Sequence, residues 1–176
     1  MRRSGLALCL MLAACQPAAV SNDMAAEAGG LPASGLERAA IESGVISDAA
    51  KISPVGLFQR RHEAGRDALC IIPAANGTLR FGLEANFGEQ LACRGNGTIR
   101  RAGEKLILRF AGVDRCIIVA QYDGDQVALP GVVDLACGRL CDGRGTLEGV
   151  SFPRIAGDAA TALRARGPGG QPLCKS

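Results

Sequence analysis

Aromatic side chains are scarce in this chain. Phe, Tyr and Trp make up 3% of its 176 residues, Trp is absent and Tyr122 is the single tyrosine. An interface that depends on buried aromatic anchors is therefore disfavoured. The chain also has only one histidine, His62, which leaves little material for histidine-based metal sites or acid–base catalysis.

Several catalytic signatures are missing. There is no Gly-x-Ser-x-Gly elbow and no phosphate-binding Gly-x-x-x-x-Gly-Lys-Ser/Thr loop, and His62-Glu63 does not continue into His-Glu-x-x-His. His62 lies in the charged stretch 60–66, which we expect to be a hairpin tip with a structural or solvated histidine. We therefore expect no enzyme, no catalytic residue and no cofactor.

Carboxylates could still meet in space, but the sequence does not select a pair. The acidic residues considered for such a pair are Glu84, Glu89, Asp114, Asp123 and Asp125. Asp123 and Asp125 are expected in a solvated turn. The stretch Tyr122–Asp125 bears a faint likeness to a calcium loop, but it lacks the twelve-residue spacing and the terminal Glu of an EF-hand.

The longest apolar stretch near the N-terminus is too short to cross a bilayer, which takes about 20 residues. It runs from Leu6 to Leu12 behind the basic pair Arg2-Arg3, as in a signal peptide. The following Leu12-Ala13-Ala14-Cys15 resembles the lipobox of bacterial lipoproteins, which is Leu, two small residues and Cys.

The resemblance to bacterial lipoproteins implies a membrane anchor. In that family the Cys thiol receives a diacylglyceryl group, cleavage occurs just before this Cys, and the new amine is acylated, commonly with palmitate. We therefore expect a signal peptide at 1–14, lipidation of Cys15 and a flexible tether at 15–33, which is rich in Ala, Gly and Ser. Gln16 follows the lipidated Cys where Asp would favour the inner membrane, so the resemblance implies the outer membrane, with the domain facing the periplasm.

The expected cleavage also changes the charge. Loss of Arg2 and Arg3 lowers the formal net charge from +3 to +1. A nearly neutral chain lacks the electrostatic footprint of a nucleic-acid binder, so no nucleic-acid partner is expected. The basic pairs Arg60-Arg61 and Arg100-Arg101 are expected on solvated strand faces.

Cysteine usage predicts disulfides. Of eight Cys, Cys9 lies in the signal peptide and Cys15 would carry lipid. An even set in an exported protein indicates three bridges, with fifteen pairings open. A metal site is disfavoured because Cys137-x-x-x-Cys141 is the only close pair and His62 is distant in sequence. The six candidates for disulfides are Cys70, Cys93, Cys116, Cys137, Cys141 and Cys174.

Hydrophobic patterning beyond residue 51 indicates strands. Period-two alternation marks Thr78–Leu83 and Lys105–Phe110 as half-buried strands. The continuous apolar run Cys116–Ala120 predicts a central strand, and further strands are expected at Gln126–Leu129 and Thr146–Phe152. We therefore predict a mainly β domain over 51–176, an antiparallel meander barrel or sandwich stapled by disulfides.

Turn residues separate these strands. Asn76-Gly77, Asn96-Gly97 and Asp123-Gly124 predict hairpin turns because Asn, Asp and Gly tolerate positive φ. Ala102–Glu104 predicts a fourth turn. Both Asn-Gly pairs are followed by Thr and so match the glycosylation sequon, but in a chain with a bacterial lipoprotein signal we interpret them as turns.

The two Asn-Gly segments also echo each other in sequence. A looser third copy occurs at Gly143–Leu147, and four of the Cys recur at intervals of 23, 23 and 21 residues. The spacing predicts one hairpin per interval, and a repeat protein is the alternative.

Short helices are expected on either side of the strands. Ser34-Gly35-Leu36-Glu37 fits a capping box for a helix over 35–43, within a linker that spans 34–50. Asp158 is expected to cap a second short helix that ends by Arg166, before Gly167-Pro168, and Cys174 would tie down the tail.

These features favour a lipid-anchored binding module of the cell envelope with a protein partner in the periplasm. The plan resembles, in architecture alone, lipoprotein inhibitors of proteases or lysozymes, which join a lipobox to a small β-barrel. The alternatives are a structural or assembly lipoprotein of the outer membrane and a carrier of a small ligand. A filled barrel interior would favour protein binding, and an open apolar cavity would favour the carrier.

Overall fold

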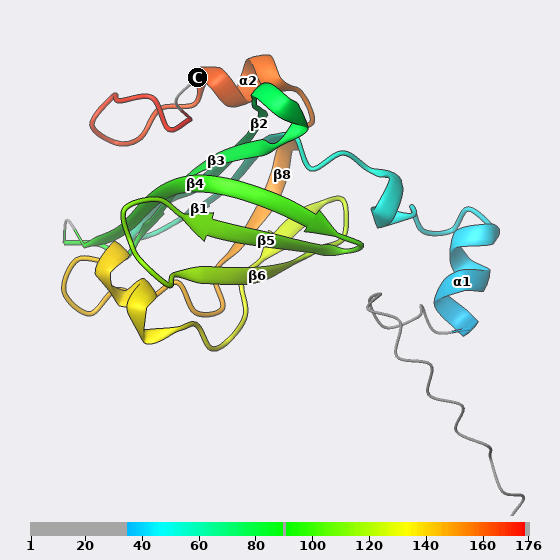
Figure 1. The fold of residues 1–176 in the computed structure, drawn as a ribbon, viewed down its shortest axis with the longest axis horizontal. Coiled ribbons are helices and arrows are strands. Elements are labelled where there is room, and N and C mark those ends of the chain that lie inside the picture. The colour runs from blue at the N-terminus through cyan, green and yellow to red at the C-terminus, as the bar shows by residue number, and fades with distance from the viewer. Residues whose placement is uncertain (1–34, 90, 175–176) are drawn as a thin grey trace, which may run out of the picture.

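Eight antiparallel strands form a closed barrel in the computed structural model, which describes residues 35–89 and 91–174 (Figure 1). Each strand pairs with the next along the chain, and β8 pairs with β1 to close the barrel. The strands are β1 (Gly56–His62), β2 (Gly65–Pro73), β3 (Leu79–Asn86), β4 (Ala92–Ala102), β5 (Lys105–Phe110), β6 (Ile117–Tyr122), β7 (Gln126–Ala128) and β8 (Ser151–Ala156). The predicted antiparallel meander is confirmed, and it is a barrel and not a sandwich.

Side chains fill the barrel interior. Alternate residues of each strand point inward, as the two-residue period of a strand requires. Two edge-to-face aromatic pairs lie in this core: Phe81 with Phe110, whose ring centroids are 4.9 Å apart, and Phe58 with Tyr122, at 6.4 Å. Interior residues that are at most 4% exposed include Phe58, Leu69, Ile71, Phe81, Leu83, Ile99, Leu106, Leu108, Phe110, Ile118, Tyr122, Val127 and Phe152.

Most predicted strands are confirmed, with two corrections. Lys105–Phe110 coincides with β5, and its alternation buries Leu106, Leu108 and Phe110. The run Cys116–Ala120 predicted a central strand, and β6 does lie between two neighbours, but Ile117 and Val119 are 39% and 46% exposed because every barrel strand has an outer face. The strand predicted at Thr146–Phe152 begins only at Ser151, since residues 146–150 form the end of a loop.

Three of the four predicted turns are confirmed. Gly77, Gly103 and Gly124 have positive φ in the connections β2–β3, β4–β5 and β6–β7. Asn96-Gly97 is wrong as a turn, because it lies in the middle of β4 and pairs with Gly82 and Phe81 of β3. A Cβ at position 97 would overlap the backbone oxygen of Arg109 on β5, so this glycine allows close approach of two strands.

The sequence echoes are not structural repeats. The first copy forms a short 3-10 helix, η2 (Ala75–Gly77), followed by the start of β3, and the second is the interior of β4. The third copy, Gly143–Leu147, lies in the long loop between β7 and β8. One similar sequence therefore adopts three conformations, so the echo does not mark a structural repeat.

Two α-helices flank the barrel at different places. The helix α1 (Gly35–Glu42) has no buried residue and stands away from the barrel in Figure 1. The helix α2 (Ala159–Arg164) packs against β1 and β2, and the carboxylate of Asp158 accepts a hydrogen bond from the Thr161 N–H, as predicted for its cap. No helix among the described residues has the length and apolar character needed to cross a membrane.

All six predicted cysteines form disulfides. Cys70 pairs with Cys174, Cys93 with Cys141, and Cys116 with Cys137. The first bridge ties the C-terminal tail to β2, and the other two hold η3, a 3-10 helix over Leu135–Leu140. Cys15 and the whole predicted lipobox, with the tether that follows, lie outside the described residues.

The segment before β1 is clamped onto the barrel by two arginines. It contains η1 (Ala49–Lys51), and Arg101 donates to the carbonyls of Ala49 and Ile52, the latter at 2.7 Å. Arg154 donates to the carbonyls of Ser53 and Val55 at 2.9 and 3.1 Å. Arg101 was predicted on a solvated strand face, and that prediction is wrong because its guanidinium satisfies the backbone of this segment.

Candidate functional site

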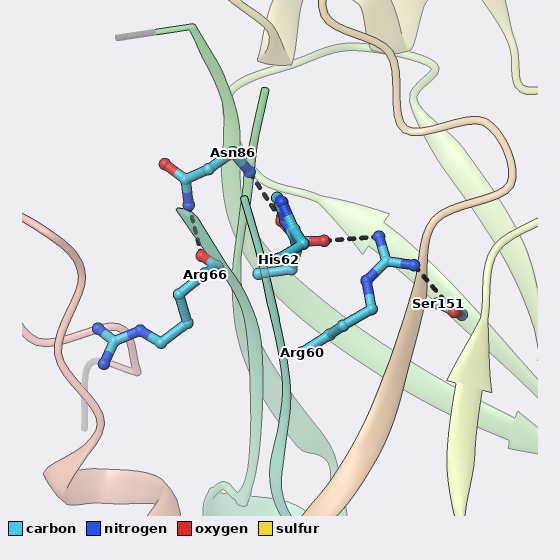
Figure 2. A network of polar contacts seen from close by, with 6 residues as sticks. Arg60, His62, Arg66, Asn86 and Ser151 are labelled. Carbon is cyan, nitrogen blue, oxygen red and sulfur yellow. Dashed lines mark hydrogen bonds and ion pairs between the residues drawn. The ribbon is translucent and has the colours of Figure 1, made fainter. Parts of the chain in front are cut away.

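A buried carboxylate organises a polar network at one end of the barrel (Figure 2). Asp67 is 2% exposed and accepts hydrogen bonds from Arg60 Nη2 at 2.8 Å and His62 Nε2 at 3.0 Å. Its Oδ1 also accepts from the backbone N–H of Asn86 at 2.8 Å. Arg60 reaches onward to Ser151 Oγ at 3.5 Å, which links β1, β2, β3 and β8.

Strand pairing explains why these residues meet. Arg60 lies directly opposite Asp67 in the β1–β2 register. Each of the two lies two residues from an inward-facing position of its own strand, so both are on the inward face. Asp67 follows the inward alternation of Leu69 and Ile71, so its carboxylate points into the mouth of the barrel and not toward solvent. A buried carboxylate is tolerated only when it is paired, and Arg60 and His62 supply that pairing.

This network has the base but not the nucleophile of a catalytic triad. Asp67 orients the His62 imidazole, as a carboxylate does in a Ser-His-Asp arrangement. The nearest hydroxyl in the network, Ser151 Oγ, contacts Arg60 and not His62. The predicted place of His62 at a charged hairpin is confirmed. Arg60 is not the solvated arginine that was predicted, because it pairs with Asp67.

An open hollow of about 590 Å³ lies beside this network. It is bounded by the β1–β2 hairpin, the end of β3 and the C-terminal segment that follows α2. The lining residues are Arg61, His62, Ala64, Gly65, Arg66, Asn86 and Pro168.

A second buried carboxylate lies on the outer face of β3. Glu84 accepts from Arg94 Nε at 2.8 Å, and Arg94 Nη1 also contacts Asp142 at 3.0 Å. The hydrogen bond to Glu84 is the main cause of a raised pKa of Arg94. Together with Gln171 and Leu173 of the C-terminal segment, Glu84 and Arg94 line a neighbouring hollow, so this ion pair supports the tail that Cys174 ties down.

The loop between β7 and β8, residues 129–150, presents apolar side chains to solvent. Its base is closed by backbone hydrogen bonds from Leu129 N to Val150 O and from Gly149 N to Pro130 O, at 2.8 and 2.9 Å. Although two disulfides fix η3 within it, Val132 is 80% exposed and Leu135 is 97% exposed. We call this segment the stapled loop.

Among the carboxylates that the sequence could not pair, Asp123 and Asp125 lie in one turn and border the same hollow, whereas Glu84 lies on β3. Asp123 Oδ1 accepts the backbone N–H groups of Asp125 and Gln126, which confirms its place in a turn. Glu84 is engaged by Arg94 instead of by another acid. Within residues 35–89 and 91–174, no group of three or more His, Cys, Asp or Glu side chains is arranged to hold a metal ion.

Sequence reasoning missed Asp67, the centre of the network. The available signal was the position of Asp67 in its strand. It is a charged residue two and four positions before the apolar Leu69 and Ile71, and so falls on the same inward face.

Comparison of the chain with protein-family models, with curated proteins and with solved structures finds no match. The site is therefore interpreted from its own geometry.

Proposed function

We propose that this chain is a lipid-anchored protein of the bacterial cell envelope that binds a partner protein through the stapled loop. The observation that carries this proposal is the exposure of Leu135, 97%, and Val132, 80%, on a loop fixed by two disulfides. Single exposed apolar residues are common on protein surfaces. Here, however, both belong to one loop that the fold holds rigid.

The rigidity of the stapled loop favours tight binding. Leu129 before the two exposed residues and Cys137 after them are buried in the core, so the backbone that carries Val132 and Leu135 is anchored on both sides. A preordered loop loses little conformational entropy when a partner binds. Burial of one leucine side chain contributes about 1.5–3 kcal/mol, so a pocket that accepts Leu135 would supply a large part of the affinity.

The packed interior supports protein binding over the carrier alternative. A carrier needs an internal cavity, whereas Phe58, Tyr122 and Phe152 occupy the interior of this barrel and are fully buried. The binding surface that we propose therefore lies on the outside, at a loop held in place by the barrel.

The disulfides support an exported location. All six Cys beyond the lipobox are paired in the structure, which is typical of proteins that fold in an oxidising compartment. Together with the lipobox resemblance at Leu12–Cys15, the disulfides support our proposal of an outer-membrane anchor with the domain facing the periplasm. A secreted protease or a lysozyme is the partner class we propose, with the chain as its inhibitor.

Co-purification and inhibition assays test the proposal together. We expect the full-length chain, cross-linked in cells, to retain a discrete envelope or secreted protein, and Leu135→Asp to abolish that retention. The purified chain is then assayed against a panel of proteases and lysozymes, in which inhibition by the native protein and not by Leu135→Asp identifies the partner class.

Ile155→Asp is the matched control, because Ile155 is an apolar residue 59% exposed on β8, outside the stapled loop. Equal loss of the partner in both variants would show that the stapled loop is not the binding surface. Retention of no partner by the native chain would contradict protein binding altogether, and association with the outer membrane that persists in Cys15→Ala would contradict the lipid anchor.

A further inference from the structure

The hollow beside the Asp67 network carries positive charge that the described part of the chain does not neutralise. Arg61 and Arg66 lie directly opposite each other in the β1–β2 register, and both side chains belong to the outer face of the sheet. Like charges in such a cross-strand pair destabilise a sheet. None of the ion pairs among residues 35–89 and 91–174 involves either arginine.

One of these arginines is held in place without being neutralised. Arg66 Nη2 donates to the backbone carbonyl of Arg166 at 2.7 Å, which fixes the guanidinium beside the C-terminal segment. In Figure 2 the Arg66 side chain extends away from Arg60, toward that segment. Its remaining N–H groups and all those of Arg61 have no acceptor among the described residues, so both guanidiniums are free to bind an anion.

His62 adds a third group to the hollow. Because the buried Asp67 carboxylate accepts from Nε2, this ring nitrogen carries a proton, and Nδ1 has no partner among the described residues. The charge of Asp67 does not cancel that of Arg61 and Arg66, since Asp67 is already paired with Arg60 at 2.8 Å.

We propose that this hollow binds a phosphoryl group. Two guanidiniums with unpaired N–H groups match the negatively charged oxygens of a phosphoryl group, and guanidinium is suited to bidentate recognition of phosphate oxygens. A bound phosphate would also relieve the repulsion between Arg61 and Arg66. The phosphoryl group belongs either to a lipid headgroup or to a soluble phosphate compound, and the experiment separates these sources.

The single histidine makes nuclear magnetic resonance a direct test. The imidazole Cε1–H resonance of His62 is followed in the full-length chain, held in dodecyl maltoside micelles that contain no phosphate, while inorganic phosphate is added. We expect a saturable shift of this resonance if the ligand is soluble. If the source is a lipid, we expect the shift to occur without added inorganic phosphate when phosphatidylglycerol is mixed into the maltoside micelles.

Arg61→Gln and Arg109→Gln form the matched pair of variants. Arg109 is an exposed arginine on β5 that does not line the hollow, and both variants lose the same charge. Loss of charged hydrogen bonds in Arg61→Gln should weaken binding about tenfold or more, while Arg109→Gln binds as the native chain does. Equal weakening in both variants, or no shift with either phosphate source, would overturn the proposal. It does not depend on the stapled loop, so Leu135→Asp should leave the shift unchanged.

Discussion

Asp67 is a buried charge at the mouth of the barrel, paired with Arg60. We expect Asp67→Asn to lower the free energy of unfolding by about 1–3 kcal/mol, because Arg60 and His62 lose a charged acceptor that is buried between them. Urea unfolding measures the change. Asp125→Asn, at an exposed turn position, is the control and should stay within about 0.5 kcal/mol of the native chain. A native-like stability of Asp67→Asn would show that the network is not stabilising.

Tyr122 offers a second test at the same scale, since the chain has one tyrosine and no tryptophan. Burial raises the pKa of the Tyr122 phenol, and the nearby Arg154 and Arg101 only partly oppose this shift. A folded-state pKa above the unfolded one stabilises the protein below about pH 10. That contribution is lost as the pH rises through the folded-state pKa.

Phenolate absorbance should therefore give a single transition in the folded chain, at higher pH than in the same chain unfolded in urea. The urea-unfolded chain is its own control. A folded-state midpoint at or below the unfolded one would mean that the arginines outweigh burial.

The residues that sequence reasoning misjudged are those with tertiary partners. Arg60 and Arg101 look like surface charges in the sequence, yet one pairs with a buried carboxylate and the other binds the carbonyls of Ala49 and Ile52. Those partners lie up to 52 residues away in the chain. No local pattern records such a contact, whereas the local cap at Asp158 was predictable because donor and acceptor are three residues apart.

At the scale of the strand, Gly97 tests why an Asn-Gly pair can lie inside a sheet. We expect Gly97→Ala to destabilise the protein by about 1–3 kcal/mol, because the added Cβ would overlap the Arg109 carbonyl of the neighbouring strand. Thermal and urea unfolding measure the loss. Gly131→Ala is the control, since a Cβ there meets nothing within 4 Å and the loop should tolerate it. Equal stabilities of the two variants would contradict a steric role for Gly97.

Period-two alternation identified β5 and most of β3 correctly, because this pattern indicates a strand with one buried face. A barrel strand has one buried face, as any half-buried strand does. Turn residues predicted the positions of turns less reliably. Gly124 adopts positive φ in a turn, but Gly97 serves close packing of β4 on β5, and a sequence of Asn followed by Gly is compatible with both.

At the scale of the whole molecule, the sequence predicted a meander but not its closure or its disulfide pairing. Closure depends on β8 meeting β1 across almost the full length of the domain, with Leu57 opposite Ala156. The three disulfides likewise join cysteines that are far apart in sequence, with separations of 104, 48 and 21 residues. Loop-closure entropy makes the longest of these links the most restrictive for the unfolded chain.

Each disulfide can be removed by substituting both of its cysteines with Ala. The resulting loss of unfolding free energy should increase with the length of the loop that the disulfide closes. The chain-entropy relation gives losses of about 5 kcal/mol for Cys70–Cys174, about 4 for Cys93–Cys141 and about 3 for Cys116–Cys137. Urea unfolding of the three variants under identical conditions measures the order, and the native chain is the reference. The Cys70–Cys174 variant should in addition release the C-terminal segment and expose Glu84, which faster amide exchange in β3 would report. If removal of the shortest bridge were the most destabilising, the disulfides would act mainly by holding η3 and the stapled loop in their folded positions, and not by restricting the unfolded chain.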